Sequence, residues 1–249
     1  MSRTPLVHLD GSLAGADVGD RVPLSEAEHH HLGAVLRLRD GDPVEISDGA
    51  GRLAAGELAG ASVALTSAVV WHPAPAPLLR VAHALPKGRK LDEAVRACVE
   101  LGMDALVPVT AERSVRRPEG GRADKAVRRW ASVARAACEQ SRRVHRPTIE
   151  PVTGVEDLRP RGVWLLAHPE ARTSLPEALP TPMDGTNGDA SDAVTVAVGP
   201  EGGWTDAEVS SLTARGARAV HLGPSVLRTE HAAAAALAVM GALTGRWTP

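Results

Sequence analysis

From residue 79 onward, short apolar runs alternate with longer segments of helical periodicity. In residues 90–101, four apolar side chains recur at helical spacing before Gly102 ends the pattern. Alternation of strand and helix over this length predicts a mostly parallel α/β sheet. The predicted strands are residues 79–84, 105–109, 163–167, 193–198 and 219–222, and the other predicted helices are residues 124–141, 206–215 and 231–243.

The N-terminal part of the chain has a different pattern, with strand-like segments separated by Asp-Gly turns. We expect a small β-barrel there, with strands at residues 21–24, 43–47, 53–58 and 62–70. Ser25 and Glu28 have the spacing of a capping box, which predicts a helix over residues 25–36. Residues 71–77 contain prolines at positions 73, 75 and 77 and read as a stiff linker. The predicted domains are therefore residues 1–72 and 73–249.

Composition limits the class of protein. The N-terminus lacks the features of a signal peptide and no apolar run reaches eighteen residues, so we expect a cytoplasmic protein. Cys98 and Cys138 fall on apolar helix faces without CxxC spacing, which favours buried, reduced thiols. Phe and Tyr are absent from the chain. RNA binding by a platform of stacked aromatic rings is therefore disfavoured.

The chain carries a net charge of only −2, but residues 112–146 contain eleven Lys or Arg and four acidic residues, a local charge of +7. A basic segment of this kind is often one solvated helix face. It is also the electrostatic footprint of a phosphate-binding surface. Both interpretations stay open on charge alone.

Two glycine-rich loops follow predicted strands, at residues 199–204 and 222–230. Parallel sheets bind ligands at the carboxyl ends of their strands, and glycine lets the backbone approach a ligand closely. Ordinary strand-to-helix turns are the alternative. Neither loop has the GxxxxGK[ST] or GxGxxG spacing of phosphate-binding loops. A nucleoside-bearing ligand without phosphates fits better, held by backbone groups with Leu222, Val226 and Leu227 packed on its base.

Four separated blocks carry a family resemblance: LPKGRKLDEAVRACVELGMDALVPVTAERSV at 85–115, RWASVARAACEQSRR at 129–143, GPEGGWTDAE at 199–208 and LGPSVLRTEHAAAAAL at 222–237. Together they resemble the bacterial 16S ribosomal RNA uracil-N3 methyltransferase family of the SPOUT superfamily. Residues 30–58 are similar to the barrel of that family, which is PUA-like. The resemblance covers nearly the whole chain.

The resemblance implies a C-terminal α/β domain with a deep trefoil knot and a homodimer. It also implies S-adenosylmethionine, bound in a bent shape by the knot loops, as the cofactor, with no metal. The reaction would be methylation of N3 of a uridine in 16S rRNA of the small ribosomal subunit. Carried onto this chain, the cofactor-binding residues are Leu166, Ala167, His168, Glu170, Gly199, Pro200, Glu201, Gly202, Gly203, Leu222, Gly223, Ser225, Val226, Leu227 and Arg228.

Methylation at N3 of uracil requires that a proton with a pKa well above neutrality leaves the ring. We expect Arg228 to stabilise the developing charge on the uracil carbonyl oxygens. Glu230 or Glu201 would then orient Arg228 or accept the proton. The alternative is that both glutamates only favour helix N-termini through the helix dipole.

Basic side chains outside the loops are candidates for contacts with RNA phosphates. Adjacent helical histidines point in different directions, so His29, His30 and His31 cannot share one metal ion, and an RNA contact is the better interpretation for His30. Arg142 and Arg143 could face either RNA or a dimer partner. The full set is His30, Arg37, Arg39, Lys87, Arg89, Lys90, Arg113, Arg116, Arg142 and Arg143. Two competing functions are a non-catalytic RNA-binding scaffold and methylation of a different base.

Overall fold

The computed structural model describes residues 4–179 and 193–247. Its internal contacts divide the chain into two units, Met1–Ala74 with Arg135–Arg146, and Pro75–Ala134 with Pro147–Pro249. The sequence pattern marks one change of architecture, near residue 72. It gives no sign that residues 135–146 belong with the N-terminal unit.

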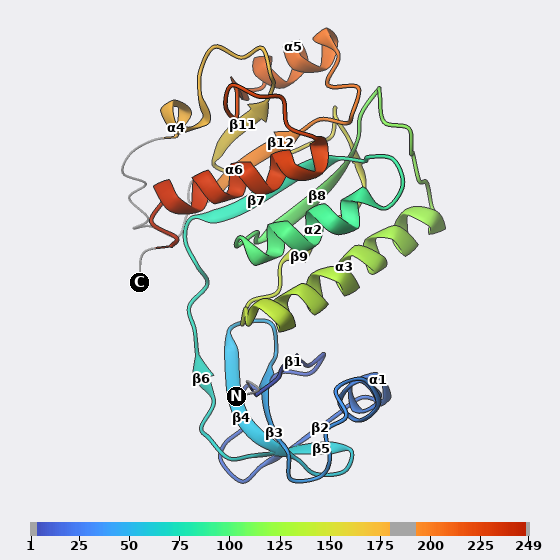
Figure 1. Cartoon of the computed structure of the whole chain (residues 1–249), viewed down its shortest axis with the longest axis vertical. Helices are drawn as coiled ribbons and strands as arrows, with labels where there is room; N and C mark the ends of the chain where they lie inside the picture. Colours follow the sequence, from blue (N-terminus) through green and yellow to red (C-terminus); the bar gives the residue numbers. More distant parts are fainter. Residues whose placement is uncertain (1–3, 180–192, 248–249) are drawn as a thin grey trace. The chain divides into compact units, whose positions relative to one another are not determined.

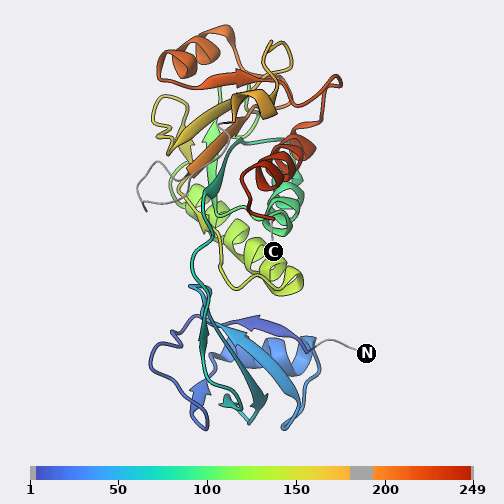
Figure 2. The same cartoon turned by 90° about the vertical axis from the view of Figure 1, so that its left-hand side faces the viewer.

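The first unit is built on a curved sheet (blue strands in Figure 2). Pairing runs antiparallel except between β1 (Leu6–His8) and β3 (Pro43–Ser47). Buried Leu9, Leu32, Ile46 and Val63 belong to one core cluster, which is the reason these short strands hold together. The strand order is β1 (Leu6–His8), β3 (Pro43–Ser47), β4 (Arg52–Leu58), β5 (Ser62–Leu65) and β2 (Arg21–Pro23), with β6 (Val70–Trp71) paired to β4.

The predicted helix over residues 25–36 is only partly correct. It is an α-helix α1 (Glu26–His30) followed by a π-helical turn η1 (His31–Val35). The capping box is confirmed, since the Ser25 hydroxyl accepts from the Glu28 N–H at 3.3 Å and the Glu28 carboxylate accepts from the Ser25 N–H at 2.7 Å.

The predicted strand over residues 62–70 is wrong in its middle. Thr66 and Ser67 both donate their backbone N–H to Ala55, and the Ser67 hydroxyl accepts from the Ala55 N–H. These bonds replace a regular ladder, so β5 ends at Leu65 and β6 begins at Val70.

The second unit contains a sheet whose strands are all parallel, as predicted. The strand order is β10 (Thr153–Gly154), β8 (Ala105–Thr110), β7 (Leu78–Ala84), β12 (Ala193–Val198), β11 (Val163–Ala167) and β13 (Arg218–Val220), with β9 (Thr148–Ile149) paired to β8. The sequence pattern missed β9 and β10, because two residues are too short to show a period.

Helices cover both faces of this sheet. On β7, Ala82 and Ala84 share a core cluster with Leu212 of α5 (Asp206–Ala214), whereas His83 between them contacts Thr229 at the start of α6 (Thr229–Leu243). Figure 1 shows α6 packed along β7 with α2 (Lys90–Glu100) beside it. The remaining helices are α3 (Gly121–Ser141) and the short α4 (Leu175–Ala178).

Both cysteines are buried and free, as predicted. Burial raises the pKa of Cys98 to about 12 and that of Cys138 to about 11, so both stay protonated thiols at neutral pH. No helix among the described residues combines the length and the apolar character needed to cross a membrane. The surface loop predicted at residues 181–192 lies outside the described residues.

Candidate functional site

Three of the predicted cofactor segments leave neighbouring strands at one edge of the second unit's sheet. Strand β11 lies between β12 and β13, and all three run in the same direction. Their carboxyl ends therefore deliver residues 166–170, 199–203 and 222–228 to the same edge. This is the edge at which open parallel sheets bind ligands.

Backbone and side-chain hydrogen bonds join these segments. The N–H of His168 donates to the carbonyl oxygen of Val220 at 2.9 Å, linking the segments after β11 and β13. The hydroxyl of Thr229 donates to the carbonyl oxygen of Gly199, linking the segments after β12 and β13. The segments after β11, β12 and β13 are thus joined to one another at one edge of the sheet.

Two glycines hold backbone conformations that other residues rarely adopt. Gly203 has φ +69° and closes a turn by donating to the carbonyl oxygen of Pro200 at 2.8 Å. Gly223 has φ +134° and donates to Nδ1 of His221 at 3.3 Å. A Cβ at either position would meet no neighbour, so the backbone conformation rather than space explains the glycine.

The segment after Gly223 offers backbone groups to a ligand. Residues 224–228 are exposed, and Val226 is 83% exposed despite its apolar side chain. Within the described residues, no hydrogen bond engages the backbone N–H groups of residues 225–228. Free backbone donors beside exposed Val226 and Leu227 fit the adenosine part of S-adenosylmethionine, which needs amide contacts and an apolar surface.

Two glutamates from the two glycine loops meet at one lysine. The Nζ atom of Lys90 lies 3.3 Å from Oε1 of Glu201 and 3.6 Å from Oε1 of Glu230. Glu201 also accepts the backbone N–H of Lys87 at 3.1 Å. The other carboxylate oxygen of Glu230 is buried and has no hydrogen-bond partner. In the sequence Lys90 is a candidate for RNA phosphates, and no sequence pattern indicates this cluster.

The surroundings keep both glutamates ionised. Burial raises the pKa of Glu201, but backbone N–H groups of Glu201 and Lys87 and the Lys90 ammonium outweigh it, so the pKa lies below its usual value. A hydrogen bond from its own backbone N–H at the start of α6 lowers the pKa of Glu230, and Lys90 lowers it further. These shifts make both carboxylates weaker proton acceptors than a free glutamate.

Arg228 stands at the N-terminal end of α6, immediately before the first helical residue. Its side chain is exposed, and among the described residues it makes no hydrogen bond or ion pair. Neither Glu201 nor Glu230 therefore orients it in this structure. The guanidinium is available to a ligand at the mouth of the loops.

Apart from Lys90, the predicted RNA-contacting residues divide into two groups. Arg113 donates to the carbonyl oxygen of Gly202 at 2.8 Å, Arg116 to that of Gly88 at 3.2 Å, and Arg142 to Thr4 and Glu45. Arg143 accepts a hydrogen bond from His8 through its carbonyl oxygen. The exposed side chains with no intramolecular partner in the described part are His30, Arg37, Arg39, Lys87 and Arg89.

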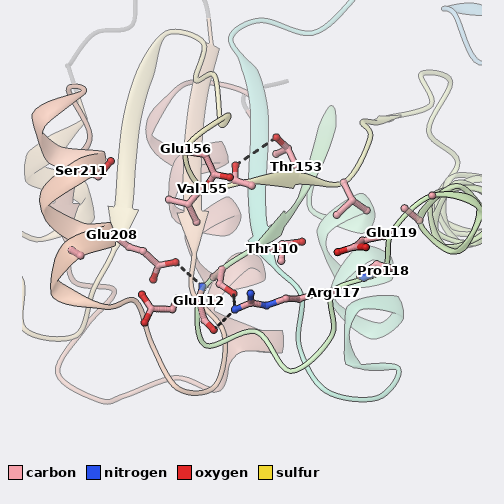
Figure 3. A pocket seen from close by; sticks show the side chains of 16 residues that line it. Thr110, Glu112, Arg117, Pro118, Glu119, Thr153, Val155, Glu156, Glu208 and Ser211 are labelled. Atoms are coloured by element: carbon pink, nitrogen blue, oxygen red, sulfur yellow. Dashed lines mark hydrogen bonds between the residues drawn. The ribbon is translucent and has the colours of Figure 1, made fainter.

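A pocket of about 720 Å³ opens near the carboxyl ends of β8 and β10 (Figure 3). Figure 3 shows the Arg117 guanidinium bonded to the loop at Glu112, with Glu119, Glu156 and Glu208 also on the walls. None of the predicted cofactor residues lines this pocket. Within residues 4–179 and 193–247, no three His, Cys, Asp or Glu side chains form a cluster suited to a metal ion.

Comparison with known proteins agrees with this architecture. A family model described as an RNA methyltransferase domain matches residues 73–241, and one described as an RNA methyltransferase PUA domain matches residues 24–62. "Ribosomal RNA small subunit methyltransferase E" of Mycobacterium bovis is 37% identical over 244 residues, covering 93% of this chain and 90% of that protein. The protein of the same name from Bacillus subtilis is 31% identical and covers 86% of each chain.

Solved structures give the same result. A ribosomal RNA small subunit methyltransferase E from Neisseria gonorrhoeae, bound to S-adenosylmethionine, is 29% identical with a TM-score of 0.82, covering 99% of this chain and 100% of that one. A methyltransferase from Legionella pneumophila, also with bound S-adenosylmethionine, has a TM-score of 0.83 at 26% identity and covers 97% and 98%. The chain therefore belongs to the RNA methyltransferase family, with a PUA domain of that family preceding the methyltransferase domain.

Proposed function

We propose that this protein transfers a methyl group from S-adenosylmethionine to N3 of a uridine in 16S rRNA of the small ribosomal subunit. The observation that carries the proposal is the meeting of three loops at one sheet edge, in a chain whose relatives are named ribosomal RNA small subunit methyltransferases. We further propose that the enzyme acts in the cytoplasm as a homodimer and that its methyltransferase domain contains a trefoil knot.

The three loops would hold the cofactor. Backbone N–H groups of residues 225–228 would bind its polar atoms, and Val226 and Leu227 would pack against its adenine ring. Bound S-adenosylmethionine supplies the methyl group. Arg113 would keep the Gly202 loop in place, since its guanidinium donates to the Gly202 and Trp204 carbonyl oxygens at 2.8 and 3.4 Å.

Arg228 is the residue that we assign to charge stabilisation. Its exposed guanidinium would face the uracil carbonyl oxygens, which become more negative as the N3 proton leaves. Glu201 or Glu230 remains the candidate proton acceptor. Because Lys90 lowers the pKa of both, either glutamate would accept a proton more readily if Lys90 moved away from it.

RNA binding is assigned to the exposed basic residues. The backbone N–H of Lys87 donates a hydrogen bond to Glu201, which places Lys87 and the neighbouring Arg89 beside the cofactor loops. In the first unit, the candidates are His30, Arg37 and Arg39. Such cations would hold the phosphate backbone and position the target base without reading its sequence.

The decisive experiment uses labelled S-adenosylmethionine and small ribosomal subunits that lack the modification, followed by digestion to nucleosides and mass spectrometry. We expect labelled 3-methyluridine. A different methylated nucleoside would contradict the N3 assignment. Tight cofactor binding without any methylated product, on subunits or on naked 16S rRNA, would instead favour a non-catalytic RNA-binding scaffold.

A further inference from the structure

A second pocket in the second unit, of about 350 Å³, lies between α2, α3 and the loop that precedes α3. It is strongly basic, since the arginines that line it outnumber the acidic residues four to one. Its volume lies within the range of small-molecule sites. The charged residues on its walls are Arg116, Arg117, Arg122, Arg129 and Asp92.

The arginines differ in how far they are already engaged. Arg116 and Arg117 each donate to a backbone carbonyl oxygen, of Gly88 at 3.2 Å and Glu112 at 2.6 Å. The exposed side chain of Arg122 makes no hydrogen bond or ion pair within the described residues. Because a guanidinium has five N–H donors, all three arginines retain donors for an anion. Phosphate is one of the anions that such a cluster binds through paired hydrogen bonds.

Asp92 leaves one acceptor atom unsatisfied on the wall of this pocket. Its Oδ2 atom is paired with Arg129, but its Oδ1 atom is buried and has no hydrogen-bond partner. A buried acceptor without a donor costs free energy and calls for an explanation. A small rotation of the Asp92 carboxylate would bring Oδ1 to the pocket surface, where a hydroxyl or N–H group of a ligand would satisfy it.

The rest of the wall is apolar. Leu85, Leu91 and Trp130 are each at least nine-tenths buried yet line the pocket. The pocket therefore combines cations for a phosphate, an acceptor for a hydroxyl or N–H group, and an apolar surface with an indole ring. A ribonucleotide has all three matching parts.

The pocket is connected to the cofactor loops through residues 86–88. Pro86 and Gly88 line it, while Lys87 between them donates its backbone N–H to Glu201 at 3.1 Å. Arg116 in turn holds the Gly88 carbonyl oxygen. A ligand in the pocket would thus contact residues 86–88, the segment whose backbone holds Glu201 in place.

We propose that this pocket binds one nucleotide of the substrate RNA that flanks the methylated nucleotide. Arg116 and Arg122 hold its phosphate, Asp92 Oδ1 accepts a hydrogen bond from its ribose or base, and Trp130 contacts its ring. The identity of the ligand as part of an RNA rests on the proposed function. A free ribonucleotide has the same chemistry and is the other possible source.

The test measures binding of a fluorescent ten-nucleotide oligoribonucleotide to the full-length protein by anisotropy, at several salt concentrations. Arg122→Ala removes a pocket cation, and Arg128→Ala is its control on the same helix, with the same charge change but outside the pocket. Ala126→Phe fills the pocket without changing charge, and Ala131→Phe is its exposed control.

We expect Arg122→Ala to weaken binding about tenfold and to reduce the slope of log affinity against log salt by about one. Ala126→Phe should weaken binding at every salt concentration, whereas both controls should bind like the unaltered protein. Equal binding by each pocket variant and its control would overturn the proposal. The proposal would also be overturned if direct titration showed that Arg122→Ala and Ala126→Phe weaken the binding of free uridine 5′-monophosphate but not the binding of the oligoribonucleotide.

Cofactor binding and nucleoside analysis separate this proposal from the proposed function. If the unaltered protein forms no methylated nucleoside while RNA binding still depends on Arg122 and Ala126, the function fails but the pocket still stands as a site for one nucleotide of an RNA. If 3-methyluridine forms at unchanged KM for subunits in both pocket variants, the pocket assignment fails and the function stands.

Discussion

The hydroxyl of Thr229 donates to the carbonyl oxygen of Gly199, so the first residue of α6 anchors the loop that leaves β12. Thr229 is 7% exposed, and its own carbonyl oxygen lies 3.2 Å from Nε2 of the fully buried His83. One residue, through its hydroxyl and its backbone carbonyl oxygen, therefore couples both glycine loops to the core of the sheet.

Thr229→Val keeps the shape of the side chain but removes the donor. The Gly199 carbonyl oxygen would lose its partner, which costs about 1–3 kcal/mol of unfolding free energy. Calorimetric titration should also show weaker binding of S-adenosylmethionine, because the Gly199 loop is no longer held. Thr229→Ser keeps the hydroxyl and is the control, and equal losses in both variants would contradict the role of this hydrogen bond.

Arg228→Ala should lower kcat by about a hundredfold to a thousandfold, the loss typical of one removed charge-stabilising donor. Cofactor affinity and melting temperature should stay nearly unchanged, because the exposed side chain makes no hydrogen bond or ion pair within the described residues. Arg96→Ala, at an exposed position of α2, is the control. A full-rate Arg228→Ala enzyme would exclude this residue from catalysis.

Gly223→Ala tests the backbone conformation of the second loop. At φ +134° an alanine is strained by about 1–3 kcal/mol, and relief of the strain would move the segment that offers its N–H groups to the cofactor. We expect weaker binding of S-adenosylmethionine by calorimetry. Gly121→Ala, at a position without positive φ or nearby atoms, should bind normally. Normal binding by both variants would show that the loop tolerates the change.

Lys90→Met should raise the pKa of both Glu201 and Glu230, since the ammonium lowers both. A carboxyl group whose pKa is lower in the folded protein than in the unfolded chain stabilises the fold at every pH above its pKa in the unfolded chain. This contribution is lost as the pH falls through the pKa of the group in the folded protein. The melting-temperature difference between the unaltered protein and Lys90→Met should therefore be largest near neutral pH and shrink in acid. A difference that does not change with pH would show that Lys90 acts by packing alone.

His8 should make the first unit sensitive to mild acid. Burial lowers its pKa to about 4, whereas the unfolded chain titrates near 6.5. Between these two pH values the unfolded state binds a proton at His8 that the folded state does not. The contribution of His8 to the unfolding free energy is therefore fully present above about pH 6.5 and is lost toward pH 4, by about 3 kcal/mol in all. Hydrogen exchange of β3 amides should follow this decline. His8→Gln should flatten it, and an equally steep decline in that variant would assign the effect to other groups.

The strand-helix alternation was enough to predict the parallel sheet, because buried strands and amphipathic helices have clear periods. The exact bounds of Val163–Ala167 and Ala193–Val198 were correct for this reason. Predictions failed where the chain departs from any period. The π-helical turn at His31–Val35 and the interrupted ladder after Leu65 depend on individual hydrogen bonds that leave no pattern in the sequence.

The two glycine loops could be placed after their strands because glycine and proline mark them; the binding of cofactor by these loops stays a prediction. Partners of the charged residues could not be predicted in the same way. Lys90 reads as one more surface cation until the fold brings Glu201 and Glu230 to it. Arg142 likewise belongs to a basic block, yet it is bonded to Glu45, 97 positions away.

Residues 135–146 limit how the N-terminal barrel could be separated from the rest of the chain. Arg135 contacts Asp10 and Glu28, and the Arg146 guanidinium donates to the carbonyl oxygens of Leu9 and Asp48. A gene fragment ending near residue 74 would encode a barrel stripped of these arginines. Exchange of this barrel between relatives, in the laboratory or by recombination, would therefore have to carry along a second, distant stretch of coding sequence.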